Sequence, residues 1–511
     1  MVLFIGYLVA VFLYAMFLRR RGSFSFFSAS QKVRWWISGL SLYMLFLSVD
    51  QGQLLTGIIA QHGMQGMWLV WSAGLGTFVV PLIFAPLWHR LNFPNDNRFL
   101  VFRYPGKDGI FLQRFRAAYV GILVVSLLTC FHLLGFSRIL EYYFHLSPHL
   151  SLVLGGCIMT AFTLKNVFDV KLKLDTLHAI MFFISLGCIA YFVFGHYFQH
   201  PEFNFFLENP EKKELLPTSI NDLFSFAVFL GVQWWSCNMF DGGGAETARF
   251  TAVSNPKEAV KAGILPVIIG FILSFFLVFH VVVLLGVGQH APPHEMNYLR
   301  SLDSLLSPLA RDIVLLGYFA MFISTVESLI TWGASLVVSD LWKGWIWPDI
   351  TEAQTTRVSL LCIAGIGIIS SIFAYCSNDL QQVIKITFSI GAGVAPLYII
   401  RWFWYRINGW SQIAAMLVSG ITTLLYPSFH SMTPMAPFPM EESRIVVVTG
   451  ITTMMWLLVT FLTKDESPLV RSRMLPFVGA AKDHFPKFAL ALMLGFLMVG
   501  MNYLIWRGIL H

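Results

Sequence analysis

Apolar residues run through the chain in stretches of about 20, the length of a helix that crosses the hydrocarbon core of a bilayer. Short polar segments that carry most of the charges separate these stretches. The pattern predicts an all-α integral membrane protein with about fourteen transmembrane helices, near residues 2–18, 35–59, 64–88, 117–137, 150–164, 175–196, 223–241, 263–288, 309–340, 358–376, 380–404, 410–427, 444–463 and 488–506.

The composition supports a membrane protein. Of the 511 residues, 57% are hydrophobic and only 12% are charged, whereas ordinary soluble domains carry about 25% charged residues. So little charge cannot cover a water-exposed surface, which excludes a soluble globular protein and a disordered chain. It also excludes a nucleic-acid binder, despite the formal net charge of +7. The partner of this surface is the lipid bilayer.

The distribution of Lys and Arg predicts the orientation, because cytoplasmic loops are enriched in these residues. If the N-terminus lies outside, 26 of the 34 Lys and Arg residues fall in inward-facing loops, namely 19–34, 89–116, 165–174, 242–262, 341–357, 401–409 and 464–487. The outward-facing segment 197–222 is acidic on balance. We therefore expect both termini outside, and the basic charge reflects topology and not a ligand.

Two predicted spans contain polar residues that a lipid-facing helix would not tolerate. The second reads LSLYMLFLSVDQGQLLTG and places Asp50 and Gln51 in an apolar run, where a charge costs at least ~2.5 kcal/mol. The seventh reads FLGVQWWSCNMFDGGGAET and includes Asn238, Asp241 and glycines 242–244. Such residues let a helix unwind and expose carbonyls and helix ends to an ion or solute. The glycines could instead simply end the seventh span.

The two interruptions lie five helices apart, which divides spans two to eleven into two units of five helices. Because five is odd, the second unit must insert upside down relative to the first, as in inverted-repeat transporters. We therefore predict one transmembrane transporter domain over residues 1–511. Its parts are an extra N-terminal helix and loop (1–34), a first inverted repeat (35–197), a second inverted repeat (223–405) and C-terminal helices (410–511).

The ninth predicted span carries a row of hydroxyl groups at helical spacing, which places them on one face: Ser324, Ser328, Thr331 and Ser335. Thr325 lies beside this row, and Glu327 adds a carboxylate at membrane depth. Hydroxyl and carbonyl oxygens suit a small hard cation. The alternative is that these side chains form hydrogen bonds between membrane helices, which is common.

Five segments of the chain resemble the sodium:solute symporter family, which includes the sodium/glucose cotransporters. In chain order they are FFSASQKVRWWISGLSL, TLKNVFDVKLKLDTLH, ETARFTAVSNPKEAVKAG, ISTVESLITWGASLVVSDLWK and IIRWFWYRINGWSQIAAM. The last two segments are the most specific. The resemblance covers nearly the whole chain and is to a bacterial branch of the family. It implies a LeuT-like fold of inverted five-helix repeats with an extra N-terminal helix.

The resemblance also implies that a sodium ion is the coupling ion. The family's main sodium site lies between the broken first core helix and the eighth core helix. Carried over to this sequence, its hydroxyl and carbonyl ligands would come from Met44, Leu47, Met321, Ser324 and Thr325. Some members bind a second sodium through an aspartate at the position of Asp175. Asp175 could instead serve the inward exit route of sodium.

Solute contacts in the family gather around the two breaks, which here carry Asp50, Gln51, Trp234, Trp235 and Asn238. Aromatic faces suit sugar rings and gate closure, and amides and carboxylates bind hydroxyl or amino groups. The tryptophans could alternatively pack at a helix interface.

Two departures from the family pattern weaken any inference about the solute. Glu327 stands where many relatives have a small or neutral residue, and it could bind a cationic solute, pair with Lys385 or titrate in a proton-coupled variant. Ala248 precedes Arg249 where a Gln-Arg pair is more usual.

These features predict a sodium-coupled symporter, and not an enzyme, that imports a small polar solute such as a sugar, an amino acid or a carboxylate. One alternative is a proton-coupled symporter that uses Glu327 or Asp175. Another is a transporter-like solute sensor, although relatives of that sort carry a kinase domain. The sequence has no H-E-x-x-H motif or nucleophile elbow that would indicate a membrane enzyme. Its short loops fit a bacterial inner membrane, and nothing in it indicates an obligate protein partner.

Overall fold

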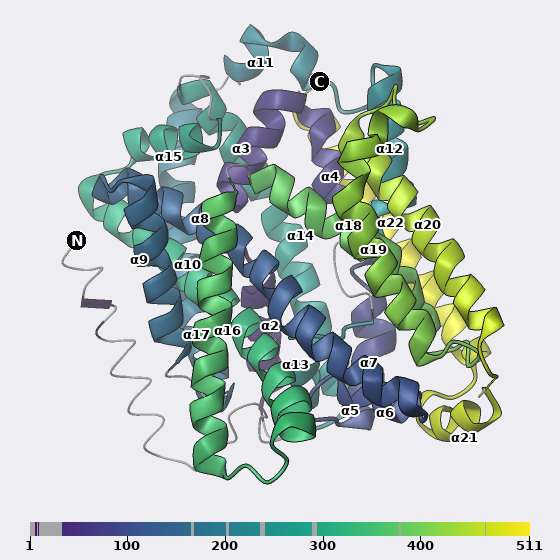
Figure 1. Cartoon of the computed structure of the whole chain (residues 1–511). Helices are drawn as coiled ribbons and strands as arrows, with labels where there is room; N and C mark the ends of the chain where they lie inside the picture. The colour runs from purple at the N-terminus through teal and green to yellow at the C-terminus, as the bar shows by residue number, and fades with distance from the viewer. Residues whose placement is uncertain are drawn as a thin grey trace.

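The computed structural model describes residues 6–7, 9, 33–164, 168–200, 204–235, 241–288, 294–377, 380–465 and 467–510. These residues form helices throughout (Figure 1). The β pairing among them is limited to an isolated parallel bridge between Val33 and Val253. The prediction of an all-helical protein is therefore confirmed for the described part of the chain.

The helices follow one another along the chain with short connections. In chain order they are α2 (Trp35–Phe46), α3 (Gln51–His62), η1 (Met64–Met67), α4 (Trp68–Trp71), η2 (Ser72–Gly76), η3 (Val80–Phe84), α5 (Ala85–Leu91), α6 (Arg98–Arg103), α7 (Lys107–Ala118), η4 (Tyr119–Val124), α8 (Val125–Phe144), α9 (Pro148–Thr163), α10 (Phe168–Gln199), α11 (Asn204–Glu208), η5 (Pro210–Lys213), α12 (Ile220–Gly231), η6 (Gln233–Trp235), α13 (Thr247–Thr251), α14 (Pro256–Val287), α15 (His294–Leu305), α16 (Pro308–Leu336), η7 (Val337–Ile346), α17 (Glu352–Cys376), α18 (Leu380–Ile400), α19 (Gly409–Phe429), η8 (His430–Met432), α20 (Met440–Leu462), α21 (Ser467–Val478) and α22 (Ala481–Leu510).

Ten helical segments within the described residues are long and apolar enough to cross a membrane, and the bent pair of α2 and α3 adds an eleventh if it counts as one span. The predicted number of about fourteen is not confirmed. The first predicted span, 2–18, lies almost entirely outside the described residues. The fifth corresponds to α9, whose 16 residues reach only about 24 Å at the helical rise. The seventh is interrupted after Gly231, and residues 236–240 lie outside the described part.

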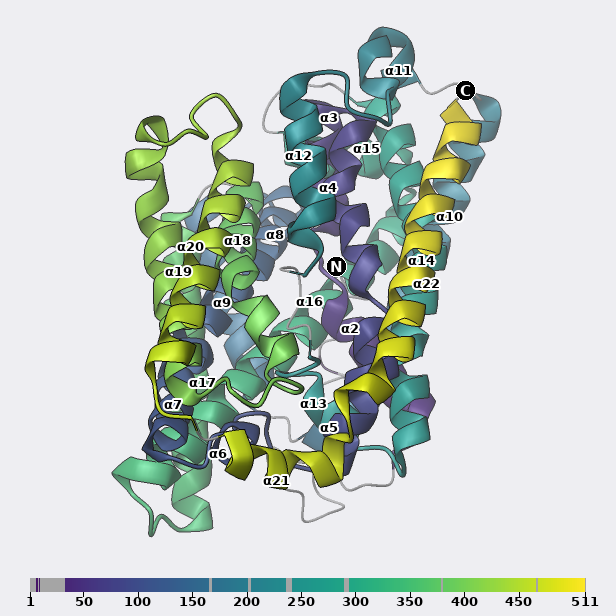
Figure 2. The ribbon, with the colours of Figure 1, turned by 90° about the vertical axis from the view of Figure 1, so that its right-hand side faces the viewer.

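Several of the described segments that the charge pattern assigns to one side of the membrane lie together. Figure 2 shows α5, α6, α13 and α21, which belong to or border the basic segments, at one end of the molecule. α11, in the acidic segment, lies at the opposite end. This arrangement agrees with the predicted alternation of inward and outward loops.

α16 lies at the centre of the molecule. Every residue from 314 to 336 is buried, as expected of a helix that is surrounded by other helices. It begins at Ser307, whose side chain accepts a hydrogen bond from the Ala310 backbone N–H, with Pro308 at the first helical position. α16 packs against α2, α8, α9, α10 and α17. The side chains of residues 314–336 therefore face other helices and not lipid.

Candidate functional site

The second predicted span is broken, as its sequence indicates. α2 ends at Phe46, α3 begins at Gln51, and the two helices are bent by 46°. Leu47 has an extended backbone with φ −70° and ψ 135°. No glycine or proline occupies positions 47–50. Instead, Ser48 donates a hydrogen bond to the Asp50 carboxylate, the kind of local bond that competes with helical pairing. The break leaves carbonyls at the end of α2 without helical partners.

Thr325 of α16 faces this break. Its Oγ1 lies 2.9 Å from the carbonyl oxygen of Met44 and 2.7 Å from that of Leu47. A hydroxyl has one hydrogen, so it can donate to only one of the two carbonyls at a time. The Thr325 hydroxyl oxygen and the two carbonyl oxygens therefore lie close together and share one hydroxyl hydrogen. All three residues are buried. Oxygen ligands of this kind could hold a small hard cation.

Ser324, the preceding residue, faces α10. Its hydroxyl donates to Asp175, which also accepts a hydrogen bond from Ser41 of α2. The Lys171 ammonium lies 2.7 Å and 2.9 Å from the two Asp175 oxygens and 3.1 Å from the Ser324 carbonyl oxygen. The structure thus brings Ser324 and Asp175 into contact, and it places a cationic side chain between them. Met321, the remaining predicted ligand, lies one helical turn before Thr325 and is buried.

Asp50 lies in a buried polar cluster between the broken span and α8. Ser48 Oγ is 2.9 Å from His132 Nδ1, which lies 3.5 Å from Asp50 Oδ1. Asp50 Oδ2 is buried and has no hydrogen-bond partner among the described residues. Gly135 makes room for this side chain, since a Cβ there would lie 2.3 Å from the Cβ of Asp50. A buried carboxylate oxygen without a partner is costly, and it is a position where a ligand could bind.

The described residues among the other predicted solute contacts have surroundings of their own. Gln51 lines a separate cavity. Trp234 and Trp235 pack edge to face, with ring centroids 5.4 Å apart. Asn238 lies outside the described residues. Glu327 is buried in α16, and its charge interacts with Lys171.

The cavity that Gln51 lines has a volume of about 400 Å³ and lies between α2, η2, α14 and α22. Its lining is mainly apolar, and Glu246 contributes a carboxyl group. Burial, reinforced by the negative charge of Asp241, raises the pKa of Glu246 to about 8. Glu246 is therefore largely protonated at neutral pH.

Three of the four hydroxyl groups in the predicted row on α16 lie on one face. Ser328, Thr331 and Ser335 line a cavity of about 30 Å³ together with Lys171 and Arg249. Arg249 Nη2 donates a hydrogen bond of 2.7 Å to Ser328, whose own hydroxyl donates to the Ser324 carbonyl at 2.8 Å. The cavity therefore begins one turn from Ser324, and it extends toward the loop between α5 and α6, where it reaches residues 94 and 95.

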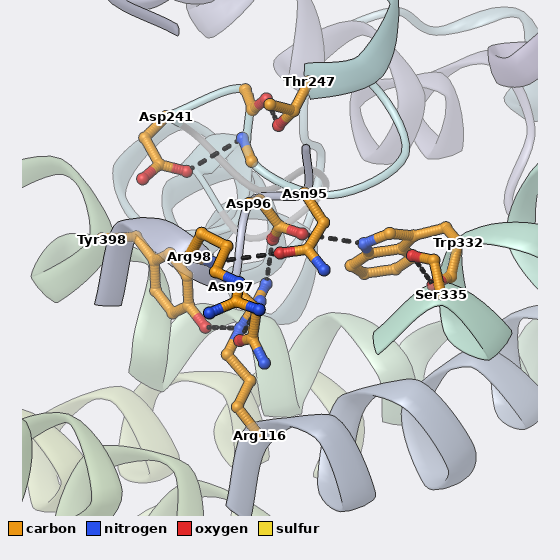
Figure 3. Close-up of polar contacts among 12 residues, drawn as sticks. Asn95, Asp96, Asn97, Arg98, Arg116, Asp241, Thr247, Trp332, Ser335 and Tyr398 are labelled. Atoms are coloured by element: carbon orange, nitrogen blue, oxygen red, sulfur yellow. Dashed lines mark hydrogen bonds and ion pairs between the residues drawn. The ribbon is translucent and has the colours of Figure 1, made fainter. Parts of the chain in front are cut away.

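Buried polar contacts close this end of the molecule (Figure 3). Asp96, in the loop between α5 and α6, pairs with Arg116 of α7 and accepts a hydrogen bond of 3.0 Å from Trp332 of α16. Arg116 also donates to the hydroxyl of Tyr398 in α18 at 3.1 Å. The loop is thus fastened to α7 and to the distant α16, and through Arg116 to α18.

A second buried ion pair holds the glycine-rich segment that follows the seventh span. Asp241 pairs with Arg401 and accepts a hydrogen bond of 2.9 Å from the indole of Trp402. Its other carboxylate oxygen accepts from the backbone N–H of Gly243 at 3.1 Å. Gly242 has φ +63° and Gly244 has φ +102°, which is backbone geometry that favours glycine. The three glycines therefore form a turn that Asp241 fixes.

Several residues at these sites were not singled out from the sequence. Lys171 falls in a segment that the charge pattern assigns to an inward loop, yet it lies buried in α10. The Lys-x-x-x-Asp spacing of Lys171 and Asp175 places both on one helical face and could have indicated the pair. His132 and Asp96 carried no comparable local signal.

Comparison with known proteins identifies the family. The family model described as "Sodium:solute symporter family" matches residues 26–419. The chain belongs to the sodium:solute symporter family. It is 23% identical to the sodium/proline symporter of Haemophilus influenzae over 297 residues, which are 53% of this chain and 56% of that protein. It is 20% identical to the osmoregulated proline transporter OpuE of Bacillus subtilis over 384 residues, 72% of this chain and 76% of that protein.

The match to the first of these relatives thus spans about half of that protein's length. Among solved structures, the substrate-bound outward-open state of a Na⁺-coupled sialic acid symporter has a similar fold, with a TM-score of 0.69 and 16% identity. The similarity covers 91% of this chain and 97% of that chain. The family and this structural neighbour are transporters and not enzymes, and the chain is a multi-pass membrane protein.

Proposed function

We propose that this protein is a sodium-coupled secondary active symporter that imports a small polar solute by alternating access. Membership of the sodium:solute symporter family and the fold shared with a Na⁺-coupled symporter support this function. The geometry that carries it is the approach of the Thr325 hydroxyl to the carbonyl oxygens of Met44 and Leu47 at the helix break.

In this proposal one sodium ion binds between α2 and α16. The Thr325 hydroxyl and the two carbonyls at the break would contribute three oxygen ligands. The Met321 carbonyl and the Ser324 hydroxyl would complete the set. Ser324 already donates its hydrogen to Asp175, but the lone pairs of the same oxygen remain able to bind a cation.

The solute would bind at the break, next to this sodium. Asp50 Oδ2 is the strongest candidate contact, because it is buried without a partner among the described residues. A solute with an amino or hydroxyl group would supply the missing hydrogen-bond donor. Gln51, Trp234, Trp235, Asn238 and Glu327 remain candidate contacts. Proline and sialic acid, which the relatives' names mention, both carry such donors and set the first solutes to test.

Coupling would follow from the shared break. Sodium would fix α2 against α16 and hold Asp50 in position, and by linkage the solute would tighten sodium binding by the same factor. We propose that residues 35–197 and 223–405 are inverted repeats whose relative rocking opens each side in turn. We also propose that the termini lie outside a bacterial inner membrane. The membrane potential then adds ~2.3 kcal/mol per charge per 100 mV to inward transport.

The test is the thermal stability of the purified protein in detergent, in sodium chloride against choline and potassium chloride at equal ionic strength. We expect stabilisation by sodium alone, its loss in Ser324→Ala and Thr325→Ala, and a further increase with one solute from a panel of amino acids, sugars and carboxylates. A ligand at ~100 times its Kd adds ~2.7 kcal/mol. Equal stability in all salts, with pH-dependent uptake into vesicles without sodium, would instead establish a proton-coupled symporter.

A further inference from the structure

Asp175 sits in a buried cage of oxygen atoms that already holds a cation. The Lys171 ammonium lies 2.7 Å and 2.9 Å from the two carboxylate oxygens and 3.1 Å from the Ser324 carbonyl oxygen. The hydroxyls of Ser324 and Ser41 donate to the same carboxylate. All four residues are buried, and none is more than 2% exposed. Carboxylate, hydroxyl and carbonyl oxygens are also the ligand types that a small hard cation prefers.

The cage is contiguous with the proposed sodium site, because Ser324 belongs to both. Ser324 and Thr325 are consecutive in α16, and they face Asp175 and the α2 break respectively. A second sodium at Asp175 would therefore have a path from the first site. The position it would need is the one that the Lys171 ammonium occupies.

The charges around the cage balance without a further ion. Arg249 lies 3.6 Å from Asp175 and donates to Ser41 at 2.8 Å. Lys171 and Arg249 thus both interact with Asp175, and Lys171 also interacts with the buried carboxylate of Glu327, so two cationic side chains accompany two carboxylates. A sodium ion added here would leave an uncompensated buried positive charge, which is strongly unfavourable.

Glu246 is the remaining carboxyl group that interacts with Arg249. Because burial raises its pKa to about 8, it is mostly neutral at pH 7 and does not alter this balance. On the same helix, His178 is buried and interacts electrostatically with Asp175 and Lys171, whereas Lys173 is exposed.

We propose that Lys171 is a tethered cation that occupies the position of a second sodium at Asp175, so that the chain binds and couples a single sodium ion. The proposal rests on the proposed function, because it takes sodium binding at Thr325 as given. In this proposal Asp175 forms a permanent ion pair with Lys171, next to the cavity that Lys171 and Arg249 line. Asp175 then does not bind a transported ion.

The test counts radioactive sodium ions bound per purified full-length chain in detergent at saturation. We expect one ion in the wild type and one in Lys171→Arg, which keeps the charge. Lys171→Ala vacates the cage and leaves Asp175 and Glu327 facing Arg249 alone, so we expect two ions. Lys173→Ala, on the exposed face of the same helix, is the matched control and should bind one.

The outcomes separate this inference from the proposed function. No bound sodium in the wild type would overturn sodium coupling itself. Two ions in the wild type would leave sodium coupling intact and overturn the role of Lys171. One ion in both the wild type and a folded Lys171→Ala would also overturn it, since the vacated cage would then take no cation. The wild-type count needs no variant, so the proposal can fail even if Lys171→Ala does not fold.

Discussion

Replacing Thr325 with valine tests the sodium site directly. Valine has nearly the same shape as threonine but lacks the hydroxyl that lies 2.9 Å and 2.7 Å from the carbonyl oxygens of Met44 and Leu47. Thr325 is only 1% exposed, so water cannot easily replace the lost group. Thr325→Val therefore removes one oxygen ligand and leaves two buried carbonyls without their donor.

The expected effect has two parts. Without sodium, the unsatisfied carbonyls should destabilise the protein by about 1–3 kcal/mol. With sodium, the lost contact resembles a hydrogen bond to a charged group, which contributes about 1.5–3 kcal/mol. Since each 1.4 kcal/mol corresponds to about tenfold in affinity, sodium should bind roughly 10- to 100-fold more weakly.

The assay is the melting temperature of the purified protein as sodium replaces choline at constant ionic strength. Thr325→Ser restores the hydroxyl and should restore most of the sodium affinity. Thr163→Val is the matched control: Thr163 is 1% exposed, and its hydroxyl donates within its own helix to the Met159 carbonyl at 2.8 Å. The reasoning is refuted if Thr325→Val folds and keeps the sodium affinity of the wild type.

Three further predictions concern the surroundings of the site. Gly135→Ala would put a Cβ 2.3 Å from that of Asp50, so it should displace Asp50 and weaken solute affinity, measured from solute-dependent stabilisation, at least tenfold, which corresponds to the ~1.4 kcal/mol that a misplaced polar contact readily costs. Arg401→Met leaves the buried Asp241 carboxylate without its cation and should destabilise the protein by about 3–5 kcal/mol in a melting assay. Glu246 has a raised pKa of about 8 against an ordinary 4.5, so the folded state holds this proton more tightly than the unfolded chain. The stability that this proton contributes is complete below about pH 4.5 and is lost as the pH rises to about 8. Glu246→Gln should therefore reduce the pH dependence of the free energy of unfolding, followed through the melting temperature, by up to about 5 kcal/mol.

Each of these predictions has its own control. Gly187→Ala adds a Cβ with no atom within 4 Å, and it should leave solute binding unchanged. Adding Asp241→Asn to Arg401→Met removes the unpaired charge and should recover most of the lost stability; no recovery would mean that the pair is not the cause. A wild-type protein whose stability does not fall between pH 5 and pH 8 more than that of Glu246→Gln would contradict the assignment of the proton.

Local pattern was sufficient to predict the features that depend on one helix at a time. Apolar run length predicts most of the spans, and polar residues inside one of them predict the break before Gln51. Helical spacing alone places Ser328, Thr331 and Ser335 on one face. Each of these inferences needs only the helix repeat and the cost of placing polar groups in a bilayer.

Contacts between distant segments were not predictable in the same way. The charge pattern counts Lys171 and Arg249 as loop residues, because the positive-inside rule treats every basic residue near a helix end alike. Both are instead buried against Asp175. Likewise, Asp96 pairs with Arg116 and with Trp332, 236 positions away in sequence. Hydropathy contains no information about which buried charges meet.

Ser324 connects the two cation positions. Its hydroxyl donates to Asp175, and its carbonyl accepts from both Lys171 and Ser328. Ser328 in turn accepts from Arg249, which lines the cavity below. A change at Thr325 acts on the sodium position alone, whereas Ser324→Ala also removes a hydroxyl that solvates Asp175. Because one residue supplies oxygen atoms to both positions, sodium binding and the ion pair are expected to be linked. If a rearrangement of Lys171 and Asp175 changes the affinity for sodium by some factor, sodium binding must change the equilibrium constant of that rearrangement by the same factor.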